Sequence, residues 1–423
     1  MFTSLHHLID GEWMREAYRR TRKDGATGID GVTAADYEKD LEANLDDLLD
    51  RMKSGRYFAP PVRRHYIPKA DGTKRPLGIP TFEDKVAQRA ILMLLEPIYE
   101  TDFLPCSYGF RPKRSAHDAL DALRKGIIEQ RQRWVIDADL KSYFDSVSRD
   151  WLVRFLEHRI GDRRVIRLIV KWLKAGVMVD GQWQDTPQGT PQGAIVSATL
   201  ANAYLHYVLD LWFHRKWRPE EAGGDAIIVR YADDVVVGFE HRRDAERFLH
   251  ALGERLGQFD LALHPDKTRL IEFGRNAEAN RRARGLGRPE TFDFLGFTHY
   301  CRKTRSGQFG LGRKPAAKRM SRTLKRIAEA LRRRMHHDLR QVVRWLGRVV
   351  NGWLNYYAVP TSSRFLRSFI CILKRIWMKA LRRRSQRDRF SWERLQALVD
   401  CYWPMPRIRH PWPSVRFAVK HPR

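Results

Sequence analysis

The chain has 423 residues and a formal net charge of +29, and this length suffices for two or three domains with well-buried cores. No stretch approaches the roughly eighteen apolar residues of a membrane span, the amino terminus lacks the pattern of a secretion signal, and the four cysteines are scattered singly. Composition therefore argues against a membrane protein, a disulfide framework and a paired-cysteine zinc site, and favours a protein of a reducing cytoplasm.

The excess positive charge is concentrated in the last third of the chain. Residues 1–300 carry 47 Lys and Arg against 45 Asp and Glu, whereas residues 301–423 carry 32 against 5. A region with that imbalance repels itself unless a polyanion neutralises it. Nucleic acid is favoured over an anionic membrane as the partner, because the aromatic residues of this region recur at the spacing of helix cores.

In chain order, residues 8–54 show leucines at helical spacing, and residues 63–80 are typical of two short strands that meet at an Asp-Gly turn. Such a hairpin would hold Lys69 and Arg75 on one stiff basic finger, which suits a triphosphate. The alternative is an exposed basic hairpin without a ligand.

A helix is expected over residues 82–100, followed by a loop at 107–116 in which Ser115 can cap the next helix. The cations of this loop could grip a nucleic-acid backbone or only solvate the loop. They are Arg111, Lys113 and Arg114.

Residues 134–147 predict a strand that carries Asp137 and Asp139 on one face, because side chains alternate along a strand. A helical stretch over 151–174 then leads to a sharp loop at 186–197 with two Pro-Gln-Gly copies. That loop could lie against a nucleotide or serve only as a structural turn, and a helix of small residues is expected from Ala194 to Leu209.

Residues 227–239 consist of two β-branched runs around a pair of adjacent acids, which predicts a strand, a tight turn and a second strand. Asp233 and Asp234 would lie together at the tip, where Asp137 or Asp139 could join them. Carboxylates so close repel each other, and the usual compensating cation for an all-oxygen site is Mg²⁺. The alternative is a solvated turn, since Asp is a common turn residue.

In the basic third of the chain we expect helices over 315–335, 338–357 and 361–384, followed by a Pro-rich tail at 404–413 that extends over the surface. Basic residues line the first of these helices. They are Arg322, Lys325, Arg326, Arg332, Arg333 and Arg334.

Taken together, these blocks resemble the reverse transcriptase/maturase proteins encoded by bacterial group II introns. The tip Tyr231-Ala232-Asp233-Asp234 is similar to the reverse transcriptase signature, and Gly352-Trp353-Leu354-Asn355-Tyr356-Tyr357 is similar to the maturase-specific block. Seven further blocks follow the order of the family. They span residues 28–33, 67–80, 108–112, 139–145, 190–193, 263–268 and 294–297.

The resemblance implies an α+β, right-hand polymerase with fingers, a palm built on an antiparallel sheet, and an all-α thumb and maturase domain. The divisions it implies are an N-terminal extension with fingers over 1–130, a palm over 131–300, a basic helical thumb and maturase domain over 301–400, and a basic tail over 401–423. It also implies that Asp139, rather than Asp137, joins the two acids of the tip as a catalytic group and as a ligand of two Mg²⁺ ions.

The same resemblance implies how a nucleotide is bound. Lys69 and Arg75 would clamp the incoming deoxynucleoside triphosphate, and Phe144 would exclude a 2′-hydroxyl. Gln192 would pack on the nucleotide and template, and Lys267 would act as a general acid toward pyrophosphate.

The implied activity is RNA-directed DNA synthesis on an RNA template with a DNA primer, together with binding of a group II intron RNA to assist splicing and mobility. The basic residues of the 107–116 loop and of the first thumb helix would contact RNA. We expect a protein of the bacterial cytoplasm, of the type that lacks a zinc-bearing endonuclease domain. Two alternatives are an RNA-binding maturase without polymerase activity and a relative recruited to phage defence or CRISPR spacer acquisition.

Overall fold

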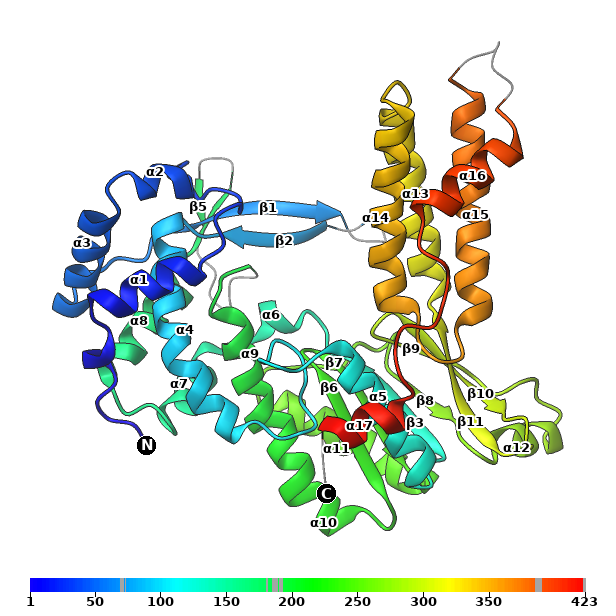
Figure 1. Cartoon of the computed structure of the whole chain (residues 1–423). Helices are drawn as coiled ribbons and strands as arrows, with labels where there is room; N and C mark the ends of the chain where they lie inside the picture. The colour runs from blue at the N-terminus through cyan, green and yellow to red at the C-terminus, as the bar shows by residue number, and fades with distance from the viewer. Residues whose placement is uncertain are drawn as a thin grey trace.

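The computed structural model describes residues 1–68, 72, 74–179, 182–184, 189, 193–384 and 390–420, and only the backbone of 417–420. Figure 1 shows N-terminal helices on one side, a central sheet, and a group of long C-terminal helices on the other side. A hairpin of β1 (Val62–Pro68) and β2 (Lys74–Ile79) extends from the N-terminal helices toward the C-terminal ones (Figure 1).

The N-terminal region is built from capped helices around a short mixed sheet. Asp10 accepts a hydrogen bond from the Trp13 amide at the start of the first helix, and Thr33 forms a capping box with Asp36 at the start of the second. The sheet order is β2-β1-β4-β5. The further elements are α1 (Gly11–Arg20), α2 (Ala34–Glu38), α3 (Leu41–Ser54), α4 (Phe82–Asp102), α7 (Arg149–Glu157), α8 (Arg163–Lys174), β4 (Val177–Val179) and β5 (Gln182–Gln184).

The central sheet is antiparallel and has the strand order β6-β7-β3-β8. Both of its faces are buried, because Val235 and Val237 pack with α11 while Val135 and Val236 pack with α5. Asp139 continues the face of Val135 and therefore lies on the α5 side. These elements are β3 (Trp134–Asp139), β6 (Ala226–Tyr231), β7 (Asp234–Phe239), β8 (Arg269–Glu272), α5 (Ala116–Glu129) and α11 (Arg242–Gly257).

The expected helix after the Pro-Gln-Gly loop begins at Ser197 rather than at Ala194. It starts as α9 (Ser197–Leu205), continues through two π-helical turns at residues 206–210 and 213–217, and ends in α10 (Arg218–Glu221). Two shorter helices complete this part of the chain, α6 (Tyr143–Ser146) and α12 (Ala277–Ala283).

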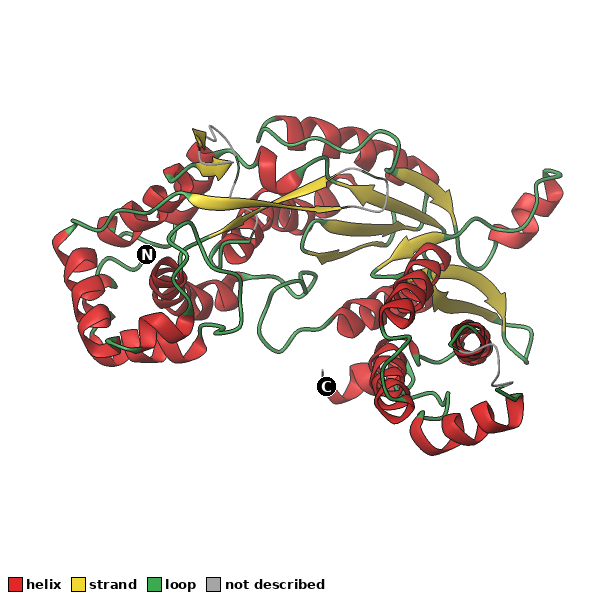
Figure 2. Ribbon diagram, turned by 90° about the horizontal axis from the view of Figure 1, so that it is seen from above, coloured by secondary structure: helices red, strands yellow, loops and turns green. Residues whose placement is uncertain are grey.

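The C-terminal third begins with a small sheet, β11-β10-β9, and continues into long helices. Figure 2 shows these helices gathered at one end of the molecule and the N-terminal helices at the other, with the strands between them. The three helices expected over 315–335, 338–357 and 361–384 are confirmed. The elements are β9 (Phe292–Phe294), β10 (Phe297–Lys303), β11 (Phe309–Pro315), α13 (Ala317–Arg333), α14 (Leu339–Tyr357), α15 (Ser363–Arg382) and α16 (Trp392–Tyr402).

The expected extended tail over 404–413 is confirmed up to residue 412, because residues 404–412 form no helix or strand and are mostly exposed. This stretch runs from α16 back to the central region, where α17 (Pro413–Lys420) packs on α5 (Figure 1). Arg416 lies 3.2 Å from Asp121 of α5, and Asp121 also pairs with Arg313 at 3.0 Å. Proline favours the first turn of a helix, so Pro413 can start α17, a helix that the sequence reading did not predict.

The α+β class is confirmed by the antiparallel central sheet and the helical C-terminal region. The division of the chain at residues 130, 300 and 400 stays a prediction. Among the residues described, no helix combines the length and apolar character needed to cross a bilayer.

Candidate active site

Asp233 and Asp234 lie at the tip of the β6–β7 hairpin. Tyr231 is opposite Asp234 in the antiparallel register, so Ala232 and Asp233 form a two-residue turn. Ala232 has a φ of 56°, the left-handed conformation that tight hairpin turns favour. Asp234 is exposed and Asp233 is half-buried, so both carboxylates remain accessible at the strand ends.

Strand register brings Asp139 to this tip. β3 runs antiparallel to β7 with Asp139 directly opposite Asp234, and directly opposed residues have their Cβ atoms about 4.5–5.5 Å apart. Asp137 lies opposite Val236 instead, and its carboxylate forms an ion pair with Arg269 at 3.3 Å. Of the two acids on β3, the structure therefore places Asp139 beside the hairpin tip.

The three carboxylates oppose one another electrostatically. Desolvation of the carboxyl group and then the charges of Asp233 and Asp139 together raise the pKa of Asp234 to about 6. Burial and then Asp139 also raise the pKa of Asp233. Arg319 of α13 partly offsets this effect at Asp234. The tip is therefore a site where an added cation is stabilised.

Lys267 and the backbone of His264 hold Asp139 from the neighbouring segment. The Nζ atom of Lys267 lies 3.0 Å from Oδ2 of Asp139, and the amide of His264 donates a hydrogen bond of 2.8 Å to the Asp139 carbonyl. Within the described ranges, no three His, Cys, Asp or Glu side chains are grouped as a ready metal site. The donor set nevertheless fits Mg²⁺, because all three side chains offer carboxylate oxygens, the ligands that this ion prefers.

A buried ion pair fixes the turn from behind. Arg230 and Asp210 both have 0% of their side chains exposed and form a bidentate pair. Arg230 also donates hydrogen bonds of 2.9 Å to Oδ1 of Asn202 and 3.1 Å to the carbonyl of Ala232. Sequence reasoning missed this network, although the arginine directly precedes the Tyr-Ala-Asp-Asp tip.

Gly109 lets a second backbone segment approach the turn. A Cβ atom on Gly109 would lie 2.4 Å from the Ala232 nitrogen, closer than any side chain permits, and the Gly109 carbonyl accepts a hydrogen bond of 2.6 Å from Asn202. The Tyr-Gly-Phe-Arg-Pro block thus supports the acids through its backbone rather than through its cations.

The predicted nucleotide-binding residues are placed in part. Arg75 is exposed on β2 and lies near enough to Asp233 to lower its pKa. Phe144 is half-buried on α6, with its ring 5.3 Å from that of Tyr143. Lys69 and Gln192 lie outside the described residues.

The ends of the Pro-Gln-Gly loop that flank Gln192 are packed against two other segments. A Cβ atom on Gly189 would lie 2.7 Å from the carbonyl oxygen of Phe144. A Cβ atom on Gly193 would lie 2.7 Å from the carbonyl oxygen of Gly78 on β2. Gly189 therefore packs against α6, and Gly193 packs against β2 of the hairpin.

The structure contradicts the prediction that Arg111 contacts RNA. Its guanidinium pairs with Glu100 at 2.9 Å and donates 2.9 Å hydrogen bonds to the carbonyls of Leu104 and Ser107, with 3% of the side chain exposed. These internal partners leave it unavailable to RNA. Lys113 is exposed, and Arg114 lies over the ring of Tyr108.

The predicted cations of the first thumb helix lie on α13 with one exception. Arg334 follows the end of the helix, is half-buried, and lies 4.6 Å from the ring centroid of Trp345. The other five are exposed and form one basic surface, which we call the α13 surface. They are Arg322, Lys325, Arg326, Arg332 and Arg333.

Comparison with known families and structures bears on both halves of the chain. A family model described as reverse transcriptase (RNA-dependent DNA polymerase) matches residues 67–299, and a model of the group II intron maturase-specific domain matches residues 317–399. A solved telomerase structure from Candida albicans, with a fragment of telomeric RNA, has a TM-score of 0.46 and 12% identity over 88% of this chain and 66% of that one. A similarity at this TM-score and identity does not establish a shared function.

Two curated proteins are similar in sequence. Protein YkfC of Escherichia coli is 37% identical over 304 residues, which cover 63% of this chain and 78% of YkfC. The group II intron-encoded protein LtrA of Lactococcus lactis is 32% identical over 283 residues, which cover 66% of this chain and 46% of LtrA. The match thus spans somewhat less than half the length of LtrA.

Proposed function

The chain belongs to the reverse transcriptase family of RNA-dependent DNA polymerases, and we propose that it copies RNA into DNA at Asp139, Asp233 and Asp234. The observation that supports this most is the register of Asp139 opposite Asp234 at the hairpin tip. A purely structural turn gains nothing from three mutually repelling carboxylates, whereas phosphoryl transfer needs divalent cations held at one point.

In this proposal the three acids hold two Mg²⁺ ions. Such ions activate the primer 3′-hydroxyl and offset the charge of the leaving pyrophosphate. The contribution of the chain is to hold the carboxylates in one geometry, through the β3–β7 register and the Arg230 hydrogen bond to the Ala232 carbonyl.

The residues around the acids would bind and orient the nucleotide. Arg75 binds the triphosphate through its planar guanidinium, and Lys69 contributes a second positive charge. Lys267, which already contacts Asp139, supplies a proton to the departing pyrophosphate. Phe144 excludes ribonucleotides by contact with their 2′-hydroxyl, and Gln192 packs on the nucleotide and template.

We further propose that the C-terminal helices bind a group II intron RNA and assist its splicing and mobility. The maturase-specific match over residues 317–399 and the net charge of residues 301–423 both support this role. The α13 surface presents five exposed cations on one helix, which is an arrangement that can track a phosphate backbone.

Primer extension tests the polymerase directly. The purified chain is incubated with a DNA primer annealed to an RNA template, deoxynucleoside triphosphates and Mg²⁺, and we expect DNA products of template length. Omission of Mg²⁺ or of the RNA template serves as the control. A protein that binds the RNA but extends no primer would contradict the polymerase proposal and favour the RNA-binding maturase without polymerase activity.

Magnesium and protons should compete for the acidic tip, because the pKa of Asp234 is raised to about 6 and that of Asp233 is also raised. As the pH rises toward about 6, the Mg²⁺ concentration for half-maximal DNA synthesis should fall by about tenfold per pH unit for each proton displaced. Without Mg²⁺, the free energy of unfolding should fall over the same rise, since the folded state binds these protons more tightly than the unfolded state. Primer extension and urea unfolding at several pH values measure both, and an Mg²⁺ requirement independent of pH would contradict the assignment.

A further inference from the structure

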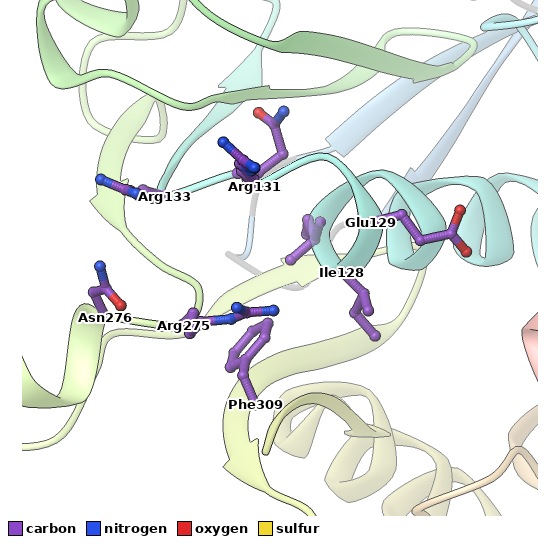
Figure 3. Close-up of a pocket in the computed structure, with 9 residues that line it drawn as sticks. Ile128, Glu129, Arg131, Arg133, Arg275, Asn276 and Phe309 are labelled. Carbon is purple, nitrogen blue, oxygen red and sulfur yellow. The ribbon is translucent and has the colours of Figure 1, made fainter.

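A hollow of about 340 Å³ lies at the end of the central sheet opposite the acids (Figure 3). It is lined by the end of α5, the segment before β3, the start of α12 and Phe309 of β11. Trp134 begins β3 and Asp139 ends it, and five residue steps along a strand span about 17 Å. The hollow is therefore separate from the candidate active site.

Three arginines line this hollow (Figure 3): Arg131 and Arg133 from the segment between α5 and β3, and Arg275 from the segment before α12. All three are exposed, and in the described part of the chain none of them forms a salt bridge or a side-chain hydrogen bond. The one acid among the residues that line this hollow is Glu129, and its carboxylate forms an ion pair with Lys125 at 3.9 Å. We call this cluster the Arg131 pocket.

The backbone that carries the Arg131 pocket is rigid. The amide of Arg133 donates a hydrogen bond of 2.8 Å to the Phe239 carbonyl, and the Arg133 carbonyl accepts one of 2.8 Å from the Phe273 amide. Arg133 therefore extends the hydrogen-bond ladder of the central sheet. Gly274, which precedes Arg275, has a φ of 103° and packs so closely that a Cβ atom would lie 2.3 Å from the carbonyl oxygen of Gln132. The backbone from which Arg133 and Arg275 project is therefore already ordered before a ligand binds.

Arg131 itself adopts an unusual conformation, with a φ of 46°. The left-handed region is disfavoured for a residue with a long side chain, and such strain is concentrated at functional sites. At Arg131 this backbone conformation turns the chain between α5 and β3, and the arginine lines the hollow.

An adjoining hollow of about 390 Å³ shares Ile128, Arg275 and Phe309 with the first and adds Arg302 and Lys303. Lys303 lies 3.6 Å from Glu278. Because they share three lining residues, the two hollows adjoin, and together they are lined by five cations, two acids (Glu129 and Glu278) and the half-buried ring of Phe309.

We propose that the Arg131 pocket and its neighbour bind an RNA strand, with guanidinium groups on successive phosphates and a base against Phe309. Guanidinium forks match phosphate oxygens, and aromatic rings are the platforms on which single-stranded bases stack. The pairing of cations with a ring favours a single strand over duplex DNA, whose bases are not free to stack. The choice of RNA rests on the proposed function, and the contact would lie outside the maturase-specific match.

The test reverses three charges at the pocket, Arg131→Glu, Arg133→Glu and Arg275→Glu together, and measures binding of a fluorescent polyuridylate RNA as a function of KCl concentration. Single-stranded RNA affinity depends on salt with a slope of about 0.7 per phosphate contact. We therefore expect weaker binding and a slope less steep by about 2 than in the unchanged protein. A photocrosslink from 4-thiouridine RNA to the β10–β11 hairpin at Phe309 is expected in the unchanged protein and lost in the variant.

The matched control makes the same charge change on α8, where Arg163, Arg164 and Arg167 are exposed. Equal slopes for the two triple variants would overturn the proposal, because general charge would then explain the loss. An equal loss of affinity for duplex DNA would overturn the assignment to a single strand, and an equal loss of affinity for single-stranded DNA would overturn the assignment to RNA. Extension of a DNA primer on a short RNA template should persist in the pocket variant. If the unchanged protein fails in that assay, the polymerase proposal is contradicted, but the comparison of RNA binding still tests the pocket.

Discussion

Changing Asp234 to asparagine is expected to reduce DNA synthesis on an RNA template by at least about 10³-fold, because a lost metal ligand removes several kcal/mol of transition-state stabilisation. Affinity for RNA should stay within about twofold, since the basic surface that supplies it lies on other elements. Single-turnover primer extension and filter binding on the same preparations measure the two effects. The substitution keeps the size of the side chain, so folding should be preserved.

Asp137→Asn is the control for this result. Asp137 lies two residues before Asp139 on the same strand, and burial raises its pKa to about 6, as at Asp234. It pairs with Arg269 rather than with the hairpin tip, so its loss should change synthesis by only about twofold to threefold. Equal loss of activity in the two variants would show that acidity along β3, and not a metal site at the tip, supports activity.

Much of this site could be predicted because its determinants are local. The β-branched runs around Asp233 and Asp234 specify a hairpin wherever they occur, and the alternation along β3 fixes which residues share a face. The choice between Asp137 and Asp139 was different. Periodicity placed both on one face, and only the pairing with β7 shows which of them lies opposite Asp234.

Arginine burial could not be predicted, because it depends on partners far away in the sequence. Arg111 stands in a loop with other cations, yet Glu100 and two carbonyls enclose it. Arg230 is buried against Asp210, a residue on a π-helical turn that carries no sequence signal. A charged residue with a buried partner and one with a solvated partner look alike in a sequence.

Interactions between segments far apart in the chain were missed for the same reason. The charge of Arg319 on α13 lowers the pKa of Asp234 at the acidic tip, and α17 packs on α5, where Arg416 lies 3.2 Å from Asp121. The two residues of each pair are more than 80 positions apart in the sequence. Local propensity predicts the helices that form such contacts but not the surfaces on which they pack.

Changing Arg230 to methionine is expected to lower the free energy of unfolding by about 3–5 kcal/mol, because it leaves the carboxylate of Asp210 buried without a partner. The side chains of the pair have no exposed surface, and Arg230 also donates hydrogen bonds to Oδ1 of Asn202 and to the Ala232 carbonyl. Urea unfolding followed by tryptophan fluorescence measures the loss. A decrease below about 1 kcal/mol would mean that water reaches the pair and that the site is not sealed.

The double variant Arg230→Met/Asp210→Leu separates stability from positioning. Removing both charges should recover most of the lost free energy of unfolding, since apolar side chains of similar size replace buried ion pairs with little penalty. DNA synthesis should not recover in parallel, because the turn at Ala232 still lacks its hydrogen bond, and a displacement of the acids by about 1 Å can reduce the rate by about 10²-fold. A double variant that regains both stability and full synthesis would show that Arg230 stabilises the palm without setting the geometry of the acids.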